Sequence, residues 1–215
     1  MDEARIRAEI VEFGRRLYAR GLIAANEGNV SVRDGDVLYV TPAGASKGFL
    51  EPGMVVKTDL LGHPLEHGGP TTELPMHVAI YRRRPDVRAV VHAHPPTATG
   101  FAVAGIPLDR PVVAEAVVVL GRVPVVPYET PGSEELAERI AEAAAESNAV
   151  LLASHGATTV GETLSRAWER METLEQVARV SLVARMLGRE DVLPLDAVYR
   201  LVGMRAADWM SLTGQ

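Results

Sequence analysis

Apolar residues recur at helical spacing over much of the chain. Near its start, Ile6, Ile10 and Leu17 fall on one face of a 3.6-residue repeat, which predicts an amphipathic helix over residues 3–20. The same spacing, with capping and turn residues at the ends, predicts helices over residues 73–84, 97–104, 133–147 and 162–187 and a short last helix from about residue 194. Each such helix buries one face and needs a sheet or another helix to cover it.

Shorter apolar or alternating runs between these helices predict strands. Residues 30–33 alternate, Asp34-Gly35 is a hairpin-turn signal, and residues 37–40 form the returning strand. Further strands are predicted for residues 55–58, for the apolar runs 89–91 and 150–153, and, as two short strands, for the Val-rich stretch 111–128. Because strands and helices interleave without a regular βαβ period, we expect one α/β domain spanning residues 1–215, with a mixed, largely antiparallel sheet between layers of helices.

Two histidines, His92 and His94, directly follow the apolar run 89–91. Side chains two residues apart on a strand point to the same face, so both imidazoles can bind one cation. His155 ends the run 150–153 in the same way, and two strand ends at one edge of a sheet would bring it beside the pair. A lone histidine there is more often a hydrogen-bonded structural residue, but three in matching positions favour a metal site. Zinc is the default for three histidines and an open position, although copper, iron and nickel also suit imidazole.

Composition and charge limit the other possibilities. The chain has no cysteine, so disulfides and thiolate ligands are excluded and only His, Asp and Glu can bind a metal. The lack of cysteine, with a charged start that has no signal-peptide pattern, leads us to expect a cytoplasmic protein. The net charge of −6 argues against a nucleic-acid partner. No apolar run approaches the roughly 18 residues of a membrane span, so we expect no membrane partner.

Glu73, at the start of the predicted helix 73–84, has two interpretations. A carboxylate at a helix N-terminus stabilises the helix dipole. Beside three histidines, it can instead be a fourth, displaceable metal ligand and a proton acceptor. His77 lies one turn further along the same face and is either a partner that orients site residues or an ordinary core or surface histidine. Thr72 is the predicted N-cap of this helix.

Several loop residues suit an anion such as phosphate. Helix N-termini attract anions through free backbone N–H groups, and the hydroxyls of Thr71 and Thr72 precede such a terminus. Glycine allows close backbone approach, as in Gly28-Asn29 and at Gly44. Taken one at a time, each of these is an ordinary turn residue. The patterns GxxxxGK[ST] and GxGxxG are absent, so nucleotide binding has no support.

In combination, these residues resemble a known family. Five short segments occur in its order: Gly28-Asn29-Val30-Ser31-Val32-Arg33, Thr41-Pro42-Ala43-Gly44, Thr71-Thr72-Glu73, His92-Ala93-His94 and His155-Gly156. Over residues 5–190 the chain resembles the zinc-dependent class II aldolase/adducin-head family. The resemblance implies a three-layer α/β/α fold and a homotetramer with active sites between subunits. It also implies one Zn²⁺ per subunit, bound by His92, His94, His155 and Glu73.

The resemblance further implies an enzyme, a carbon–carbon lyase. The implied reaction is reversible aldol cleavage of a ketose 1-phosphate, of the L-fuculose 1-phosphate type, to dihydroxyacetone phosphate and an aldehyde. Zinc would act as Lewis acid and Glu73 as the acid/base. The substrate phosphate would contact Gly28, Asn29, Gly44, Thr71 and Thr72. A family tyrosine that protonates the aldehyde oxygen has no counterpart in residues 111–116, which leaves Glu115 or Tyr128 as candidate donors.

Other activities on the same scaffold stay open. One is decarboxylation or a related metal-dependent cleavage of a hydroxy acid, in which Thr71 and Thr72 would lack a phosphate to bind. Another is epimerisation of the L-ribulose-5-phosphate 4-epimerase type; Glu73, where those enzymes tend to carry Asp, and the lack of their His-Ala-Asp-Tyr segment argue against it. A non-enzymatic module like the adducin head has no need of three histidines together with Glu73.

Overall fold

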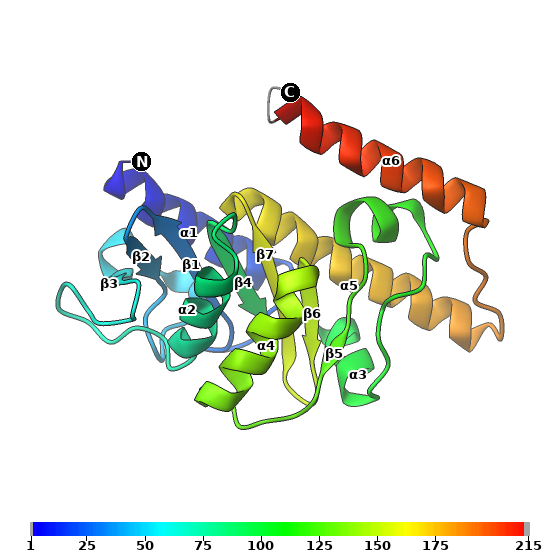
Figure 1. Cartoon of the computed structure of the whole chain (residues 1–215). Helices are drawn as coiled ribbons and strands as arrows, with labels where there is room; N and C mark the ends of the chain where they lie inside the picture. The colour runs from blue at the N-terminus through cyan, green and yellow to red at the C-terminus, as the bar shows by residue number, and fades with distance from the viewer. Residues whose placement is uncertain (1, 213–215) are drawn as a thin grey trace.

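A seven-stranded sheet forms the centre of the molecule, with the strand order β3-β2-β1-β4-β7-β6-β5 (Figure 1). The structure is a computed structural model of the 215-residue chain, and it describes the backbone of residues 2–212 and the side chains of residues 2–203. The strands are β1 (Asn29–Asp34), β2 (Val37–Val40), β3 (Val56–Asp59), β4 (Ala89–Ala93), β5 (Val125–Val126), β6 (Ala149–Leu152) and β7 (Gly156–Gly161). Every neighbouring pair is antiparallel except β5 and β6. The predicted mixed, largely antiparallel sheet is confirmed.

Helices cover both faces of this sheet, so the fold has three layers (Figure 1). One face carries α1 (Glu3–Ala19), α3 (Pro96–Val103) and α5 (Leu164–Met186), and the other carries α2 (Leu74–Arg83) and α4 (Glu134–Glu146). The last helix, α6 (Leu195–Leu212), extends away from the sheet. Short helical turns are η1 (Lys47–Phe49), η2 (Pro52–Met54) and the π-helical η3 (Ala116–Leu120).

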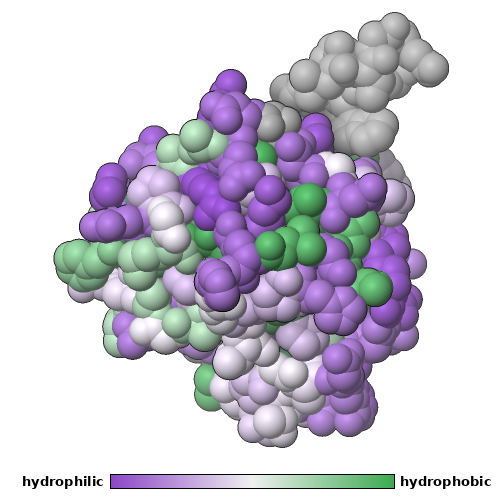
Figure 2. Space-filling view, turned by 90° about the vertical axis from the view of Figure 1, so that its left-hand side faces the viewer, coloured by the Kyte–Doolittle hydropathy of each residue, from purple (hydrophilic) through white to green (hydrophobic). Residues whose placement is uncertain are grey.

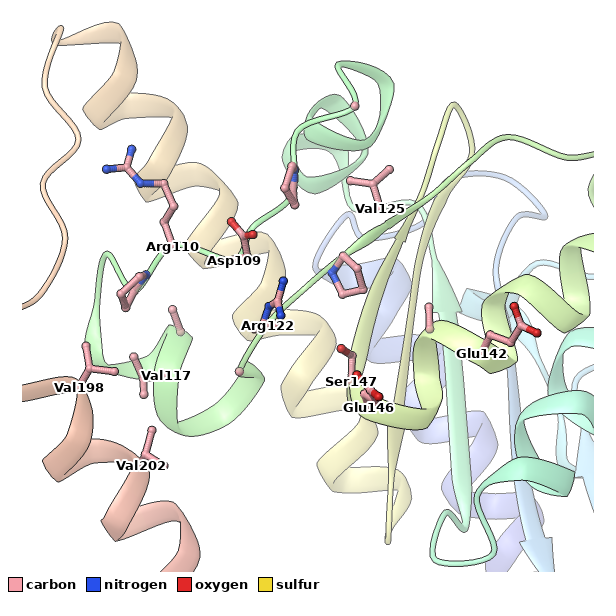
Figure 3. Close-up of a pocket in the computed structure, with 17 residues that line it drawn as sticks. Asp109, Arg110, Val117, Arg122, Val125, Glu142, Glu146, Ser147, Val198 and Val202 are labelled. Atoms are coloured by element: carbon pink, nitrogen blue, oxygen red, sulfur yellow. The ribbon is translucent and has the colours of Figure 1, made fainter. Parts of the chain in front are cut away.

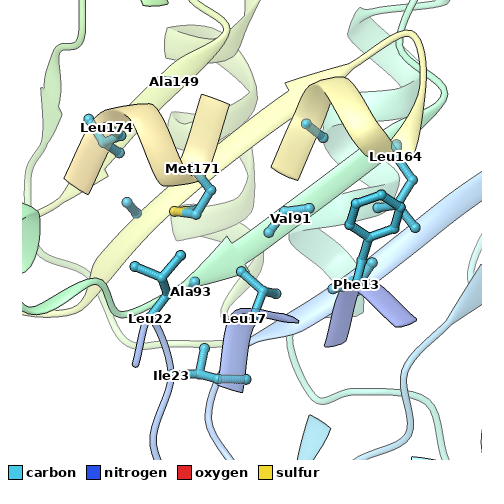
Figure 4. Packing of buried hydrophobic residues seen from close by; sticks show 14 of the residues in the cluster. Phe13, Leu17, Leu22, Ile23, Val91, Ala93, Ala149, Leu164, Met171 and Leu174 are labelled. Atoms are coloured by element: carbon cyan, nitrogen blue, oxygen red, sulfur yellow. The ribbon is translucent and has the colours of Figure 1, made fainter. Parts of the chain in front are cut away.

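The larger of the two cores fixes the strand that ends in the histidine pair. Figure 4 shows Phe13 and Leu17 of α1 and Met171 and Leu174 of α5 gathered around β4. All five residues of β4 are buried. Because close-packed interiors resist displacement, the end of β4 is held rigidly by both helices.

The Val-rich stretch 111–128 does not form two strands as predicted. Residues 116–120 make the π-helical turn η3, and only Val125–Val126 pair as a strand. A run of β-branched residues favours a strand locally, but η3 packs against α5 and α6, and these tertiary contacts override that preference.

Two further predictions near the histidines and α2 also change. Residues 156–161 form β7, a strand that the sequence did not predict. The segment has a glycine at each end and two threonines inside, so it lacks a clear apolar run. The predicted N-cap, Thr72, is exposed and caps nothing. Instead, the hydroxyl of Thr71 accepts a hydrogen bond from the Glu73 backbone N–H over 3.3 Å, and α2 begins at Leu74.

The face of the molecule beside β3 is mainly hydrophilic. Figure 2 shows this face, on which purple hydrophilic residues surround small, separate green areas. Scattered hydrophobic residues of this kind are normal on protein surfaces. Within the described part of the chain, no helix is long and apolar enough to cross a bilayer.

Candidate metal and acid–base site

The sheet topology brings the three predicted histidines together. Strands β4 and β6 are both antiparallel to β7, which lies between them, so they run in the same direction and end at the same end of the sheet. His92 and His94 lie at the end of β4, and His155 lies in the turn between β6 and β7. One nitrogen from each imidazole lies within 4.8 Å of the others.

The ε-nitrogens of this cluster face one another. Nε2 of His92 lies 3.1 Å from Nε2 of His94. The ring centroid of His155 lies 4.7 Å from that of His92 and 5.0 Å from that of His94. His92 is fully buried, whereas His94 keeps 23% of its side chain exposed, so the cluster is accessible on the His94 side.

The other ring nitrogens have different environments. Nδ1 of His92 donates to the carbonyl oxygen of Ala157 over 3.0 Å, which leaves the Nε2 lone pair directed into the cluster. Nδ1 of His94 contacts the Glu27 carboxylate. Nδ1 of His155 is buried and has no hydrogen-bond partner among the described residues. Fixing one nitrogen in this way orients the other as a ligand.

Burial favours the neutral form of His92 and His155, the form that binds a metal ion. The pKa of His92 lies well below its usual value, first because of burial and then because of the nearby His155 and His94. Burial also lowers the pKa of His155, although the Glu73 carboxylate acts in the opposite direction. A neutral imidazole presents a lone pair.

Glu73 completes the cluster from the N-terminal end of α2. Its Oε2 lies 3.2 Å from Nε2 of His92, and its Oε1 lies 3.3 Å from Nε2 of His155. Only 14% of its side chain is exposed. Lone pairs that converge this closely repel one another unless a cation or shared protons lie between them. Three histidines and one carboxylate are a ligand set that suits zinc, so the residues fit a metal ion.

His77 is a buried partner of the site rather than a surface histidine. Its Nε2 lies 2.5 Å from Oδ1 of Asn29, and its Nδ1 lies 2.7 Å from Oγ of Ser31. The pKa of His77 is lowered to about 3, mainly by burial and secondarily by His92. His77 is therefore neutral at physiological pH, and each ring nitrogen has one hydrogen-bond partner.

Two of the three segments predicted to bind phosphate, those that hold Gly44 and Thr71, lie side by side. The Thr71 N–H donates to the carbonyl of Thr41 over 3.1 Å, and the Ala43 N–H donates to that of Gly69 over 3.0 Å. Gly44 is exposed and Thr71 is largely buried. The structure thus joins the loop that holds Gly44 to the segment that leads into α2.

Gly28 lies beside His92 and has no room for a side chain. Its φ of +72° is in the left-handed region, and an added Cβ would come within 2.9 Å of the His92 carbonyl oxygen and 2.7 Å of Ile23. The side chain of the next residue, Asn29, points toward Glu73: its Nδ2 lies 2.7 Å from Oε2 of that carboxylate. With Oδ1 on His77, both ends of the Asn29 amide have partners within the protein.

Sequence reasoning missed two charged residues beside these loops. Lys47 is only 3% exposed, and its Nζ donates to the carbonyls of Asn26 and, over 2.8 Å, of Ala45. Burial lowers the pKa of Lys47, while Glu73 and Glu27 act in the opposite direction. Lys47 begins the short helical turn η1 and Glu27 lies in the loop before β1, both next to glycine-bearing motifs, and no periodic pattern marks them.

The candidate proton donors lie apart from the cluster. Glu115 and Tyr128 are both exposed, Tyr128 by 58%, and neither makes a hydrogen bond or ion pair with Glu73 or the three histidines. A cavity of about 830 Å³ also lies elsewhere (Figure 3). It is lined by charged residues such as Arg110, Arg122 and Glu142 and by part of α6, and none of the cluster residues borders it.

Comparison with known proteins agrees with this architecture. Residues 8–182 match the model of the family described as Class II Aldolase and Adducin N-terminal domain. An L-fuculose phosphate aldolase of Methanococcus maripaludis is 37% identical over 182 residues, which cover 83% of this chain and 97% of that protein. A 3-oxo-tetronate 4-phosphate decarboxylase of Pectobacterium atrosepticum is 34% identical over 204 residues, 90% of this chain and 94% of that protein.

A solved structure shares the whole fold. That structure, an L-fuculose 1-phosphate aldolase, superposes with a TM-score of 0.88 at 30% identity and covers 93% of this chain and 95% of its own. The chain therefore belongs to the class II aldolase/adducin family. It is an enzyme of that family, a lyase, and the family resemblance inferred from its motifs is confirmed.

Proposed function

We propose that this protein is a zinc-dependent aldolase that cleaves a ketose 1-phosphate of the L-fuculose 1-phosphate type into dihydroxyacetone phosphate and an aldehyde. The observation that carries the proposal is the position of Glu73, whose two carboxylate oxygens face the ε-nitrogens of His92 and His155. A carboxylate beside a metal ligand set is suited to move a proton at the carbon next to a carbonyl group. The relative named as an L-fuculose phosphate aldolase supports the choice of substrate.

His92, His94 and His155 would hold the Zn²⁺, with Glu73 as a fourth ligand that substrate can displace. When bound, such a cation acts as a Lewis acid that polarises a carbonyl group and stabilises negative charge on its oxygen. The neutral state of the buried histidines and the contact of Glu27 with His94 support this assignment.

Glu73 would carry the proton that moves at carbon. During cleavage the hydroxyl on C4 loses its proton, the C3–C4 bond breaks, and C3 keeps the electron pair. Glu73 then donates a proton to C3, which completes dihydroxyacetone phosphate, and in the reverse reaction it removes that proton. Phosphate would bind near Gly28, Gly44 and Thr71, with the Lys47 ammonium beside the same loops.

A second residue must exchange the proton on the C4 oxygen. Glu115 and Tyr128 are our candidates, and because both are exposed and apart from the cluster, either would act from a neighbouring copy of the chain. We propose a homotetramer for this reason and from the family resemblance. We likewise propose that residues 1–215 act as one domain in a cytoplasmic enzyme.

A second candidate is decarboxylation of a phosphorylated 3-oxo acid. A relative that is 34% identical over 90% of this chain is named for such an activity. Its name includes a phosphate, so a phosphate site does not separate the two reactions, contrary to our expectation from sequence. Decarboxylation releases CO₂ and needs no proton donor for a leaving aldehyde, whereas aldol cleavage needs one, and neither candidate donor, Glu115 or Tyr128, makes a hydrogen bond or ion pair with the cluster.

A side-by-side assay separates these two reactions. Zinc-loaded protein is supplied with L-fuculose 1-phosphate or with 3-oxo-tetronate 4-phosphate, and dihydroxyacetone phosphate and CO₂ are both measured. We expect dihydroxyacetone phosphate from the first substrate and little CO₂ from the second. Efficient CO₂ release with no aldol cleavage would replace the aldolase proposal by the decarboxylase.

A further inference from the structure

A buried line of hydrogen bonds leads from Glu73 into the core between α2 and β1. Asn29 on β1 links Glu73 to His77, at 2.7 Å from the carboxylate and 2.5 Å from the imidazole. Ser31, two residues along the same strand, contacts the other nitrogen of His77 at 2.7 Å and the hydroxyl of Tyr81 at 2.8 Å. We call these five residues the relay.

The relay is set by the register of two elements. His77 and Tyr81 are four apart on one face of α2, and Glu73, the N-cap of that helix, comes four residues before His77. Asn29 and Ser31 are two apart and lie on one face of β1. Asn29, Ser31, His77 and Tyr81 are all at most 5% exposed, and His77 and Ser31 are fully buried. Water therefore cannot replace any one of these hydrogen bonds, and each donor must be matched to an acceptor.

The chemistry of the groups fixes the direction of every hydrogen bond. An ionised Glu73 can only accept, so Asn29 must present Nδ2 to it and Oδ1 to His77. His77 must then carry its proton on Nε2 and accept at Nδ1. The hydroxyl of Ser31 donates to that Nδ1 and accepts a hydrogen bond from the hydroxyl of Tyr81. The Tyr81 hydroxyl also lies 3.1 Å from the backbone carbonyl oxygen of Ser31.

We propose that His77 is a positioning residue that, by fixing the orientation of the Asn29 amide, holds the Glu73 carboxylate toward the three histidines. Without a donor at Nε2 of His77, the Asn29 amide could turn and present its oxygen to Glu73, which would repel the carboxylate. Buried polar groups need hydrogen-bond partners, and this need accounts for the unbroken series of hydrogen bonds in the relay. It does not require that Nδ2 of Asn29 donate to Glu73 in particular. As far as the reaction is concerned, this inference rests on the proposed function.

The relay also limits how substrate can use Asn29. One hydrogen of its Nδ2 is taken by Glu73 and its oxygen by His77. A substrate phosphate can therefore contact only the second Nδ2 hydrogen or the backbone. Asn29 thus serves the acid/base first and the phosphate second.

Spectroscopy tests the relay without any turnover. In protein labelled with ¹⁵N-histidine and loaded with zinc, two-bond ¹⁵N–¹H couplings distinguish the two neutral tautomers of each imidazole. We expect His77, identified by the signal lost in His77→Gln, to be neutral and protonated on Nε2 at pH 7. A proton on Nδ1 instead would overturn the inference.

Steady-state kinetics of two His77 variants and a control test the positioning role of His77. In His77→Gln the side-chain amide can still donate to Asn29, whereas His77→Leu cannot donate; His67→Leu changes an exposed histidine as the matched control. We expect His77→Leu to retain zinc and KM and to lose about 10- to 100-fold in kcat, with most of that loss restored in His77→Gln.

The outcomes separate this inference from the proposed function. Wild-type kcat in His77→Leu would refute the positioning role and leave the aldolase intact. An equal fall in kcat in His77→Leu and His77→Gln, together with loss of zinc from both, would show that His77 has a purely structural role. That result would also refute the positioning role. If zinc-loaded wild-type protein turns over no substrate, the proposed function fails, and the tautomer of His77 alone decides the inference. The tautomer measurement uses wild-type protein, so it stands even if His77→Leu does not fold.

Discussion

Oε2 of Glu73 lies 3.2 Å from Nε2 of His92, which joins the N-terminal end of α2 to the end of β4. The two residues come from opposite ends of one sequence segment, 73–94, in which helix and strand are linked by a short turn. Because α2 lies on one face of the sheet and β4 within it, this one segment brings a carboxylate and two imidazoles to the same point.

Replacing Glu73 by Gln should remove activity and leave the fold intact. The amide keeps the shape of the side chain but cannot exchange a proton, so we expect kcat to fall by about 10²- to 10⁴-fold. Three histidines remain, so zinc content should stay near one per chain. The matched control is Glu135→Gln, at an exposed carboxylate in the first turn of α4, which should behave as wild type. Retained activity in Glu73→Gln would assign the proton transfer to another group.

Replacing His155 by Ala should abolish stable zinc binding. The change removes one of three converging imidazoles and leaves a smaller ligand set, so zinc should be lost to a competing chelator. Zinc per chain is measured after gel filtration with a competing chelator. His67→Ala, at an exposed position, serves as the control and should retain the wild-type content. Full zinc occupancy in the His155 variant would exclude His155 as a ligand.

Gly156→Ala should disturb the histidine pair without changing any ligand. An added Cβ would come within 2.6 Å of both the Ala93 carbonyl oxygen and Cδ2 of His94, so the strand end or the ring must shift. We expect a loss of about 1–3 kcal/mol in the free energy of unfolding, together with weaker zinc binding. Gly100→Ala in α3, where nothing lies within 4 Å, should cost nothing or gain up to about 1 kcal/mol. Equal stability of the two variants would refute this packing argument.

The buried His77 should make stability depend on pH in a defined direction. The unfolded chain takes up a proton as the pH falls through the usual value near 6.5, but folded His77 does not until the pH nears about 3. Stability from this residue is therefore fully present above pH 6.5 and is lost as the pH falls toward 3. Between pH 7 and 5, chelator-treated wild type should lose on the order of 2 kcal/mol more than His77→Gln in denaturant titrations.

Exposed His67 provides the control for this titration. His67→Gln replaces an exposed imidazole outside the core and should follow the wild-type dependence of unfolding free energy on pH. Parallel curves for wild type and His77→Gln would show that His77 is not held neutral by burial.

The sequence predicted the layers of the fold better than some of its strands. The helical repeats of α1, α4 and α5 and the apolar run of β4 are strong local signals, and all appear in the structure. Strand β7 was missed because its residues, Gly156–Gly161, carry little hydrophobic signal and gain their stability from pairing on both sides. The valines of η3 gave a local strand signal that packing against α5 and α6 overrode.

The site, like the fold, has parts that local sequence signals predict and parts that depend on tertiary packing. The three histidines could be predicted to meet because each follows an apolar run, and strand ends at one end of a sheet converge. The contact of Glu27 with His94 and the relay through Asn29 and His77 could not be predicted, because they depend on how β1 is placed against α2 and β4. Such placement is a tertiary property that spacing along the chain does not encode.

The most direct test of the account is the release of dihydroxyacetone phosphate from L-fuculose 1-phosphate by protein with one zinc per chain, compared with the same protein after chelation. We predict steady release that stops on chelation and returns when zinc is added back. No dihydroxyacetone phosphate from this or any related ketose 1-phosphate, at full zinc occupancy, would contradict the proposal that the Glu73 and histidine site is that of an aldolase.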